Sequence, residues 1–232
     1  MQASAIIVAA GQGTRFGSEL PKQFLLLCGR PILAHTLLRF EQAEAITAVA
    51  LVAAAGWESY IEREIIARFQ IKKCRPLVTG GEHRQDSVWA GLQALNPSAG
   101  SVVVVHDAVR PLFSPGLLAR VLAGCEQAEG CIPGVPPKDT VKEISAQNIT
   151  KTVNREILRL AQTPQAFRAR ALKQAFKRAR EENYYATDEA GLIEHVGGKV
   201  VWVEGEEKNL KITTPSDLQV AELFARELGT CA

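Results

Sequence analysis

The sequence predicts an α/β protein in which a mostly parallel sheet is flanked by helices and a β-hairpin arm projects from the body. Three observations support this fold class. Near its start the chain has a short apolar run, residues 5–10, typical of a strand buried on both faces. Apolar runs of this kind then alternate with helix-like segments. Near residue 131 this pattern gives way to prolines, followed by two short β-like segments.

The bulk properties indicate one ordinary globular domain. A chain of 232 residues suits a single α/β domain over 1–232 with a sizeable core. Its net charge of +2 gives no reason to expect a nucleic-acid or membrane partner. No apolar run approaches the roughly 20 residues that span a bilayer. The N-terminus enters the first strand too soon to leave room for a signal peptide. We therefore expect a cytoplasmic protein.

The elements of the first half follow from apolar patterning and from glycine and proline punctuation. Pro31 suits the first turn of a helix, and residues 57–69 carry a helical stripe of apolar side chains. The expected strands are 46–54, 72–79 and 101–107, and the expected helices are 31–43, 57–69, 83–95 and 115–127.

The second half begins with a segment that departs from this pattern. Residues 132–137 are too rich in proline for a central strand. Residues 137–160 are expected to form a hairpin arm. Because an isolated hairpin is marginally stable in water, the arm should pack on another body, most simply a second copy of the chain, which predicts a homodimer. The remaining expected elements are helices 169–182 and 214–228, a short helix starting at 187–189, and closing strands 199–203 and 209–213.

A glycine-rich loop with two cations follows the first strand. Gly11 and Gly13 relax the steric limits on the backbone, so successive N–H groups can turn towards one point. Arg15 and Lys22 add positive charge, and together these features predict a polyphosphate cradle. The spacing G-x-G-x-x-x-G excludes the dinucleotide fingerprint, and the lack of a following Gly-Lys-Ser/Thr excludes a P-loop. The glycine pair alone is equally compatible with an ordinary tight turn.

An acidic residue ends the clearest central strand. Ligands of open parallel sheets lie beyond the carboxyl ends of the strands, so Asp107 and the loop after Gly11 belong at the same edge. A helix cap or turn residue is the alternative interpretation of Asp107. Because a polyphosphate cradle needs a divalent cation, and an acid at this edge can hold one together with the phosphates, we expect Asp107 to bind Mg²⁺.

The cysteines and histidines show no metal-binding pattern. The five cysteines, at 28, 74, 125, 131 and 231, contain no C-x-x-C pair. Their odd number and scatter suit small buried thiols in a reducing compartment, except that Cys231 lies in a tail expected to fray. The four histidines are equally scattered and are expected to be structural or surface residues.

The complete N-terminal stretch is more specific than its glycines. From Ala9 to Gln23 it reads A-A-G-x-G-x-R-x-G-x-x-x-P-K-Q, which resembles the signature of nucleotidyltransferases that form sugar nucleotides. The ending P-K-Q is similar to the cytidylyltransferase family that acts on 2-C-methyl-D-erythritol 4-phosphate. Matching segments continue along the whole chain, at 79–81, 84–87, 106–111, 139–140, 152–155, 163–165, 187–189 and 209–213. Val109 and Asn154 stand where alanine and aspartate would be expected.

The resemblance implies a Rossmann-like fold of the nucleotide-diphospho-sugar transferase type and transfer of CMP from CTP to methylerythritol phosphate. Its implied catalytic residues are Arg15, Lys22, Arg155 and Lys211, with Arg155 reaching across a dimer. The implied CTP contacts are Ala9, Ala10, Gly11, Gly13, Thr14, Arg15, Lys22, Gly80, Gly81, Arg84, Ser87 and Ala108. The implied acceptor contacts are Asp107, Arg110, Thr140, Arg155, Thr163, Thr187 and Lys211. Without the resemblance, Arg155 and Lys211 would be interpreted as surface cations and residues 187–189 as a helix cap.

Two other functions stay open on the sequence. A cytidylyltransferase that uses ribitol 5-phosphate would share the fold, the loop and the metal, although the arm motifs favour methylerythritol phosphate. A nucleotide-binding regulator with a dead site would be expected to have lost Arg15, Lys22, Asp107 or Lys211, and all four are present.

Overall fold

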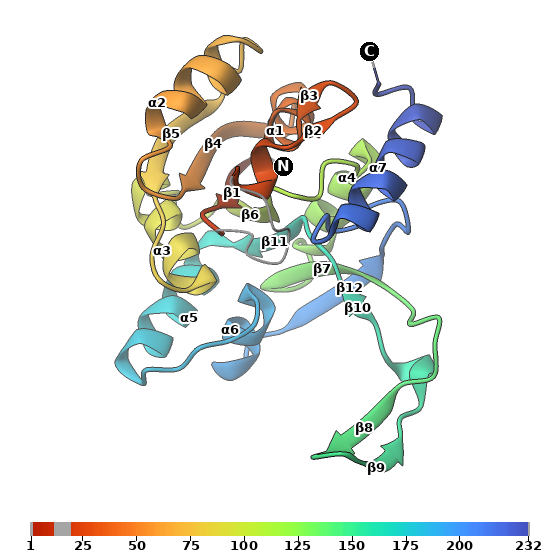
Figure 1. Ribbon diagram of the computed structural model, residues 1–232. Helices are drawn as coiled ribbons and strands as arrows, with labels where there is room; N and C mark the ends of the chain where they lie inside the picture. Colours follow the sequence, from red (N-terminus) through yellow and green to blue (C-terminus); the bar gives the residue numbers. More distant parts are fainter. Residues whose placement is uncertain (1, 12–19, 232) are drawn as a thin grey trace.

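A central sheet covered by helices on both faces forms the body of the protein, and a hairpin arm extends from it (Figure 1). This computed structural model describes residues 2–11 and 20–231. The predicted α/β class with a mostly parallel sheet is confirmed. Among the described residues, no helix is both long enough and apolar enough to cross a membrane.

The central sheet has eight strands within the described residues, and six of them run in one direction. β5, β4, β1 and β6 pair in parallel in that order, whereas β11 runs antiparallel between β6 and β7. β12 pairs in parallel with β7, and the short β10 pairs antiparallel with it. The strands are β1 (Ala3–Ala9), β4 (Ile46–Ala53), β5 (Cys74–Thr79), β6 (Val102–Asp107), β7 (Gly130–Val135), β10 (Leu160–Ala161), β11 (Gln165–Arg168) and β12 (Val200–Glu204).

Side-chain alternation along the central strands feeds two cores, one on each face of the sheet. In β6, Val102 and Val104 enter one core, whereas Val103 and Val105 enter the other. Helices α1 and α4 and the π-helix η3 contribute to the first core, and α3, α5 and α6 contribute to the second. The helical segments are η2 (Lys22–Phe24), α1 (Ile32–Gln42), α2 (Glu58–Tyr60), η3 (Ile61–Ala67), α3 (Arg84–Leu95), α4 (Pro115–Gly124), η4 (Arg155–Ile157), α5 (Ala169–Glu181), α6 (Glu189–His195) and α7 (Pro215–Glu227).

A third, smaller core joins the last helix to the segments that carry the site. Ala221 and Ala225 of α7 pack with Val109 and Ile212, which neighbour Arg110 and Lys211 in the chain. The predicted start of α7 is confirmed, because Thr214 and Asp217 form a capping box. The small hairpin of β2 (Leu26–Leu27) and β3 (Arg30–Pro31) contributes to the same core.

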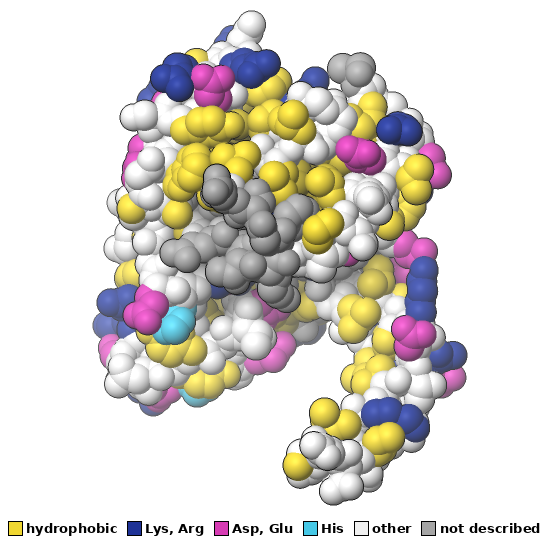
Figure 2. Space-filling view, viewed as in Figure 1, with side chains coloured by type: hydrophobic (Ala, Val, Ile, Leu, Met, Phe, Trp, Pro, Cys, Tyr) yellow, Lys and Arg dark blue, Asp and Glu magenta, His cyan; other side chains and the backbone are white. Residues whose placement is uncertain are grey.

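The predicted arm is present as a separate hairpin. Its strands β8 (Lys142–Ser145) and β9 (Asn148–Thr152) pair with each other, and every residue in them is exposed. Figure 2 shows the arm as a finger standing away from the body, with hydrophobic side chains near its end. Ile144 and Ile149, on opposite strands, are 67% and 65% exposed, so the arm leaves apolar surface in water within this chain.

Two predictions about strands are wrong. Residues 130–135 form β7, a strand with neighbours on both edges, despite Pro133. The carbonyl of Pro133 accepts from the N–H of Gln162, which lies between the end of β10 and the start of β11. Because the carbonyl and the amide position of one strand residue face the same edge, the N–H that proline lacks would also face this interruption, where no regular strand needs it. Residues 209–213 form no strand. The burial of Asn209 and the bond from the Ile212 N–H to the Val109 carbonyl fix this segment instead.

The cysteines follow the prediction in part. Cys74, Cys125 and Cys131 are buried free thiols, and burial raises their pKa values to about 12, 12 and 11. The prediction that Cys231 lies in a frayed tail is wrong, because Cys231 forms a disulfide with Cys28 across 203 residues of sequence. Spacing alone could not indicate this pair, since α7 packing on the β2–β3 hairpin brings the two residues together.

Candidate active site

A cavity lies at the carboxyl ends of β1 and β6, the edge where an open parallel sheet places its ligands. Ten of the predicted site residues line it, drawn from five separate stretches of the chain. They are Ala9, Ala10, Gly11, Lys22, Gly81, Arg84, Ser87, Asp107, Ala108 and Lys211. The predicted Gly13, Thr14 and Arg15 lie outside the described residues.

The two ends of the glycine-rich loop are held together by a side chain. Gln23 is buried, and its Nε2 donates to the Ala9 carbonyl at 2.6 Å and to the Gly11 carbonyl at 3.4 Å. These bonds fix η2 against the end of β1. They therefore set Lys22, the neighbour of Gln23, at the rim of the cavity.

A glycine allows two backbones to meet at the wall of the cavity. A Cβ at Gly80 would lie 2.4 Å from the Cβ of Ala10 and 2.8 Å from the Oγ of Ser87, so a side chain there would force these elements apart. The Ser87 Oγ also accepts from the Gly81 N–H at 3.2 Å. The residues predicted to border the base therefore lie together. Gly80 does not line the cavity itself, and its role is to let Ala10 and Ser87 approach closely.

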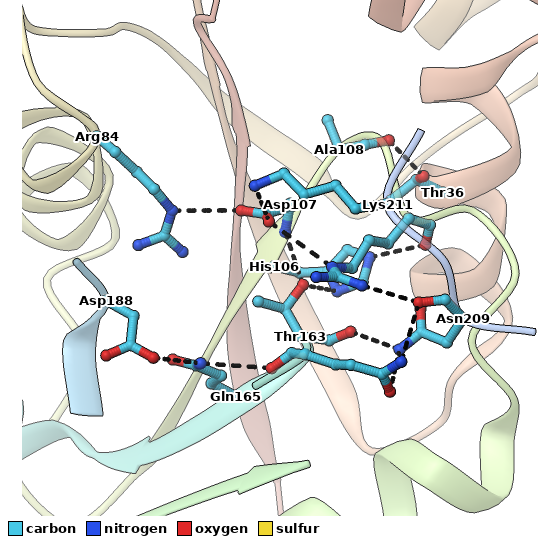
Figure 3. A network of polar contacts seen from close by, with 12 residues as sticks. Thr36, Arg84, His106, Asp107, Ala108, Thr163, Gln165, Asp188, Asn209 and Lys211 are labelled. Atoms are coloured by element: carbon cyan, nitrogen blue, oxygen red, sulfur yellow. Dashed lines mark hydrogen bonds and ion pairs between the residues drawn. The ribbon is translucent and has the colours of Figure 1, made fainter. Parts of the chain in front are cut away.

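Three cations surround Asp107, which lines the cavity, and Figure 3 shows two of them, Arg84 and Lys211, beside it. The Lys211 Nζ lies 2.8 Å from Asp107 Oδ2, the Arg84 Nε lies 3.3 Å from Oδ1, and the Arg110 Nε lies 3.8 Å from Oδ2. Burial alone would raise the pKa of Asp107, but Arg84, Lys211 and Arg110 outweigh it and hold that pKa well below its usual range. The carboxylate is therefore ionised at neutral pH.

A second carboxylate at the site is fully buried. Glu189, the first residue of α6, is 1% exposed and accepts from Arg84 Nη1 with both oxygens at 2.9 Å. Burial raises the pKa of Glu189, and Arg84 opposes that shift. Arg84 is thereby shared between two carboxylates, and its own pKa rises against the effect of its burial. Glu82 also lines the cavity, so with Lys22, Arg110 and Lys211 the described site carries four cations against three anions, an excess that suits a polyanionic ligand.

A buried chain of hydrogen bonds through His106 and Thr163 holds the backbone of Asp107. The Nε2 of His106 faces the Arg110 carbonyl at 3.0 Å, so that nitrogen carries the proton. Nδ1 then accepts from the Thr163 hydroxyl at 3.0 Å, and the oxygen of that hydroxyl accepts from the Asp107 N–H at 3.0 Å. Because burial lowers the pKa of His106 to about 3, the ring is neutral and can accept this bond.

The neutral His106 predicts that acid destabilises the fold. Its pKa is about 3 in the folded chain against 6.5 in the unfolded chain, so below pH 6.5 only the unfolded state takes up the proton. The free energy of unfolding should then fall by about 1.4 kcal/mol per pH unit between pH 6.5 and pH 4. Urea unfolding of the wild type and of His106→Gln at several pH values in that range measures the difference in slope. Equal slopes for the two proteins would contradict a neutral buried ring. Asp107 does not interfere with this measurement, because it changes the free energy of unfolding only below its ordinary pKa of 3.8.

Comparison with known proteins identifies the family of this chain. The family model described as 2-C-methyl-D-erythritol 4-phosphate cytidylyltransferase matches residues 3–227. The chain belongs to this family. The protein of that name from Pelotomaculum thermopropionicum is 45% identical over 220 residues, which cover 94% of this chain and 92% of the relative.

Solved structures extend the match to the whole fold. The 4-diphosphocytidyl-2C-methyl-D-erythritol synthase of Anaerococcus prevotii superposes with a TM-score of 0.84 at 30% identity, covering 97% of this chain and 98% of its own. The 2-C-methyl-D-erythritol 4-phosphate cytidylyltransferase of Thermus thermophilus gives a TM-score of 0.76 at 35% identity, with 97% and 100% covered.

Several predicted acceptor residues do not line the cavity. Arg110 and Thr163 contact Asp107 or its backbone, and the hydroxyl of Thr163 is committed to the buried chain described above. Thr187 is exposed just before α6. Thr140 and Arg155 lie on the arm and are exposed, and Arg155 donates to the Lys138 carbonyl.

Sequence reasoning missed the supporting residues of the site. Glu189 and Asn209 were both inside matching segments, but neither was assigned to the site. The side chain of Asn209 is buried and donates to the Thr163 carbonyl at 2.9 Å, and its own carbonyl accepts from Arg110 at 2.9 Å. Its place in a segment that matches the family was the available signal for Glu189, because an acid at the start of a helix is ordinary by itself.

The donor set is compatible with the predicted metal when phosphates complete it. Among the described residues, no three His, Cys, Asp or Glu side chains cluster closely enough to hold a metal ion. Mg²⁺ is commonly bound through one or two carboxylates together with substrate phosphates and water, and Asp107 offers one carboxylate to the cavity. The residues present therefore fit a metal that enters with a triphosphate.

Proposed function

We propose that this protein transfers CMP from CTP to 2-C-methyl-D-erythritol 4-phosphate, giving 4-diphosphocytidyl-2-C-methyl-D-erythritol and pyrophosphate. The observation that carries the proposal is the cavity at the strand ends, which Lys22, Arg84 and Lys211 line together with Asp107, in a chain of this family. A regulator that only binds nucleotide has no need of Lys22 and Lys211 at the same cavity.

The chemistry needs no general base. The second pKa of a phosphate monoester is near 6, so the attacking oxygen is already ionised at pH 7. In an in-line attack this oxygen forms a bond to the α-phosphorus of CTP. The bond between that phosphorus and the bridging oxygen breaks, and its electron pair leaves with pyrophosphate. His106 takes no part, because both of its ring nitrogens are engaged in the buried chain.

The protein's contribution is to position two polyanions and to neutralise them. We assign Lys22, together with Arg15 outside the described residues, to the triphosphate and the leaving pyrophosphate. Lys211, and Arg155 from the arm, hold and direct the acceptor phosphate. The backbone from Ala9 to Gly11 supports the nucleotide, and the wall formed by Gly81 and Ser87 borders the base. Asp107 would hold Mg²⁺, which supplies further charge neutralisation at the phosphates when it is bound.

Phosphorus NMR tests the proposed reaction directly. Incubation of the protein with CTP, Mg²⁺ and methylerythritol 4-phosphate should convert the monoester resonance into a diphosphate diester and release pyrophosphate in equal amount. A mixture in which the monoester resonance persists while the protein is folded would exclude the reaction.

The arm supports a homodimer as part of this proposal. The arm leaves three isoleucine side chains largely in water: Ile144, Ile149 and Ile157 are 67%, 65% and 78% exposed. Burying this apolar surface against a second copy would stabilise the arm. Arg155 lies beside Ile157 on η4 and does not line the cavity of its own chain, so we propose that it serves the cavity of the partner. Residence in the cytoplasm and the lack of a nucleic-acid partner stay predictions from the sequence.

Arg155→Ala should raise the KM for the acceptor by roughly 10- to 100-fold, because a hydrogen bond to a charged group contributes about 1.5–3 kcal/mol. The KM for CTP should change little, and acceptor kinetics measured at saturating CTP check this. Unchanged acceptor kinetics would remove Arg155 from the site.

Mixing two variants tests whether Arg155 acts across the dimer. In an equal mixture of Arg155→Ala and Lys22→Ala chains, each mixed dimer would hold one intact site if the arm serves its partner. Random re-assembly should then restore about a quarter of the wild-type sites. A mixture no more active than its two components would place Arg155 in its own chain's site.

A further inference from the structure

Arg84 stands between two carboxylates and is held unequally by them. Its Nη1 makes two bonds of 2.9 Å to Glu189, whereas its single contact with Asp107 is the longer 3.3 Å from Nε to Oδ1. The pair with Glu189 joins α3 to α6, which are 105 residues apart in sequence. The pair with Asp107 joins α3 to the end of β6.

Glu189 is held rigidly where it can draw Arg84 away from Asp107. Asp188 caps α6 through the Gly191 N–H at 3.1 Å, and its other oxygen accepts from Gln165 on β11 at 2.9 Å. The side chain of Gln85, next to Arg84, bonds the Tyr184 carbonyl and the Ala186 N–H, both at 3.0 Å. The start of α6 is therefore fastened to both α3 and the sheet.

Loss of the Glu189 charge would change how Arg84 meets Asp107. A guanidinium released from one carboxylate can present two parallel N–H groups to the other, and such a bidentate pair is stronger than a single contact. Asp107 already has Lys211 at 2.8 Å on Oδ2. Arg84 already donates from Nε to Oδ1 at 3.3 Å. A bidentate Arg84 would replace that one long contact with close contacts to both oxygens and leave less room for a cation at either.

We propose that Glu189 is a positioning residue that limits Arg84 to one long contact with Asp107 and so leaves the Oδ1 side of that carboxylate open to the divalent cation that enters with the nucleotide. This inference rests on the proposed function for the role of Asp107. Glu189 itself lies outside the residues that line the cavity. It acts only through Arg84.

Binding of Mn²⁺ in the presence of saturating CTP, measured from the electron paramagnetic resonance of free Mn²⁺, tests the inference without an acceptor. Glu189→Gln keeps the shape of the side chain but removes its charge. It should raise the Kd for Mn²⁺ by roughly 10- to 100-fold, the usual effect of changing a residue that orients a metal ligand. An unchanged Kd in the folded variant would overturn the proposal.

A double variant separates positioning from mere support of the fold. Arg84→Gln removes the guanidinium that would otherwise cover Asp107, so Arg84→Gln/Glu189→Gln should bind Mn²⁺ more tightly than Glu189→Gln alone. If Glu189 served only stability, the second substitution would restore nothing, and equal or weaker Mn²⁺ binding by the double variant would contradict the proposal. Should Glu189→Gln fail to fold, Arg84→Gln alone decides the matter, because it should bind Mn²⁺ at least as tightly as the wild type and weaker binding would overturn the inference.

Glu182→Gln serves as the charge-matched control. Glu182 pairs with Arg178 and His195 on α5 and α6 and lies outside the cavity, so its substitution should leave the Kd for Mn²⁺ unchanged. A failure of the proposed function would appear separately, as a wild-type protein that binds Mn²⁺ with CTP but leaves the acceptor monoester unchanged. The effect of Glu189 on metal affinity would still be measurable in that case.

Discussion

Lys22→Ala should lower turnover by roughly 100- to 1,000-fold, since removing one donor aimed at developing charge typically costs that much. Lys22 lines the cavity, and the bonds of Gln23 to the Ala9 and Gly11 carbonyls fix the backbone that carries it. The substitution shortens one side chain at the rim and leaves Gln23 in place. The loss should therefore fall on kcat for pyrophosphate release rather than on stability.

Lys177→Ala is the matched control for that experiment. Lys177 is 79% exposed on α5 and lies outside the cavity, so its turnover should equal that of the wild type. A Lys22→Ala protein that turns over at nearly the wild-type rate would remove Lys22 from the transition state.

Asp107→Asn should impair both stability and activity. It leaves Arg84, Arg110 and Lys211 without the carboxylate they share, and breaking a buried ion pair in this way costs about 3–5 kcal/mol. Turnover should fall by roughly 100-fold or more, because the variant also loses the proposed metal ligand. CTP should raise the melting temperature of the variant more than that of the wild type, because its phosphates replace the missing negative charge.

Asp217→Asn makes the same chemical change away from the cavity. Asp217 belongs to the capping box of α7, and hydrogen bonds from Thr213 and Thr214 outweigh its burial and lower its pKa. Loss of a cap contact costs about 1 kcal/mol, and turnover should stay unchanged. An Asp107→Asn protein that resembled this control in both stability and turnover would contradict the central place of Asp107.

The parts of the fold that could be predicted are those with a strong local signal. β1 and β6 are continuous apolar runs, and β6 ends at the acid that the structure places on the floor of the cavity. The arm was visible as two short β-like segments after a run of prolines, and β8 and β9 confirm it. The start of α7 was visible in its cap residues.

The parts that could not be predicted depend on contacts between distant segments. Pro133 by itself argues against a central strand, but the N–H that it lacks would face the gap between β10 and β11, where no strand hydrogen bond is needed. Residues 209–213 are expected to form a closing strand, whereas the buried side-chain amide of Asn209, bonded to the Thr163 carbonyl, fixes their path. The pairing of Glu189 with Arg84 and the disulfide from Cys28 to Cys231 likewise exist only once the helices have packed.

Within the site, the cations were easier to identify than the residues that hold them. Lys22, Arg84 and Lys211 stand in motifs that resemble those of the family, and the structure brings all three to one cavity. Glu189 looked like a helix residue, and His106 looked structural, because burial is what gives each its influence on the site.

Pyrophosphate release from CTP, measured side by side with two acceptors, tests the proposed function most directly. With Mg²⁺ present, the protein should release pyrophosphate with 2-C-methyl-D-erythritol 4-phosphate and show little or no release with ribitol 5-phosphate. Release with ribitol 5-phosphate alone would keep the fold and the cavity but overturn the acceptor. No release with either acceptor would contradict the assignment of this cavity as a cytidylyltransferase site.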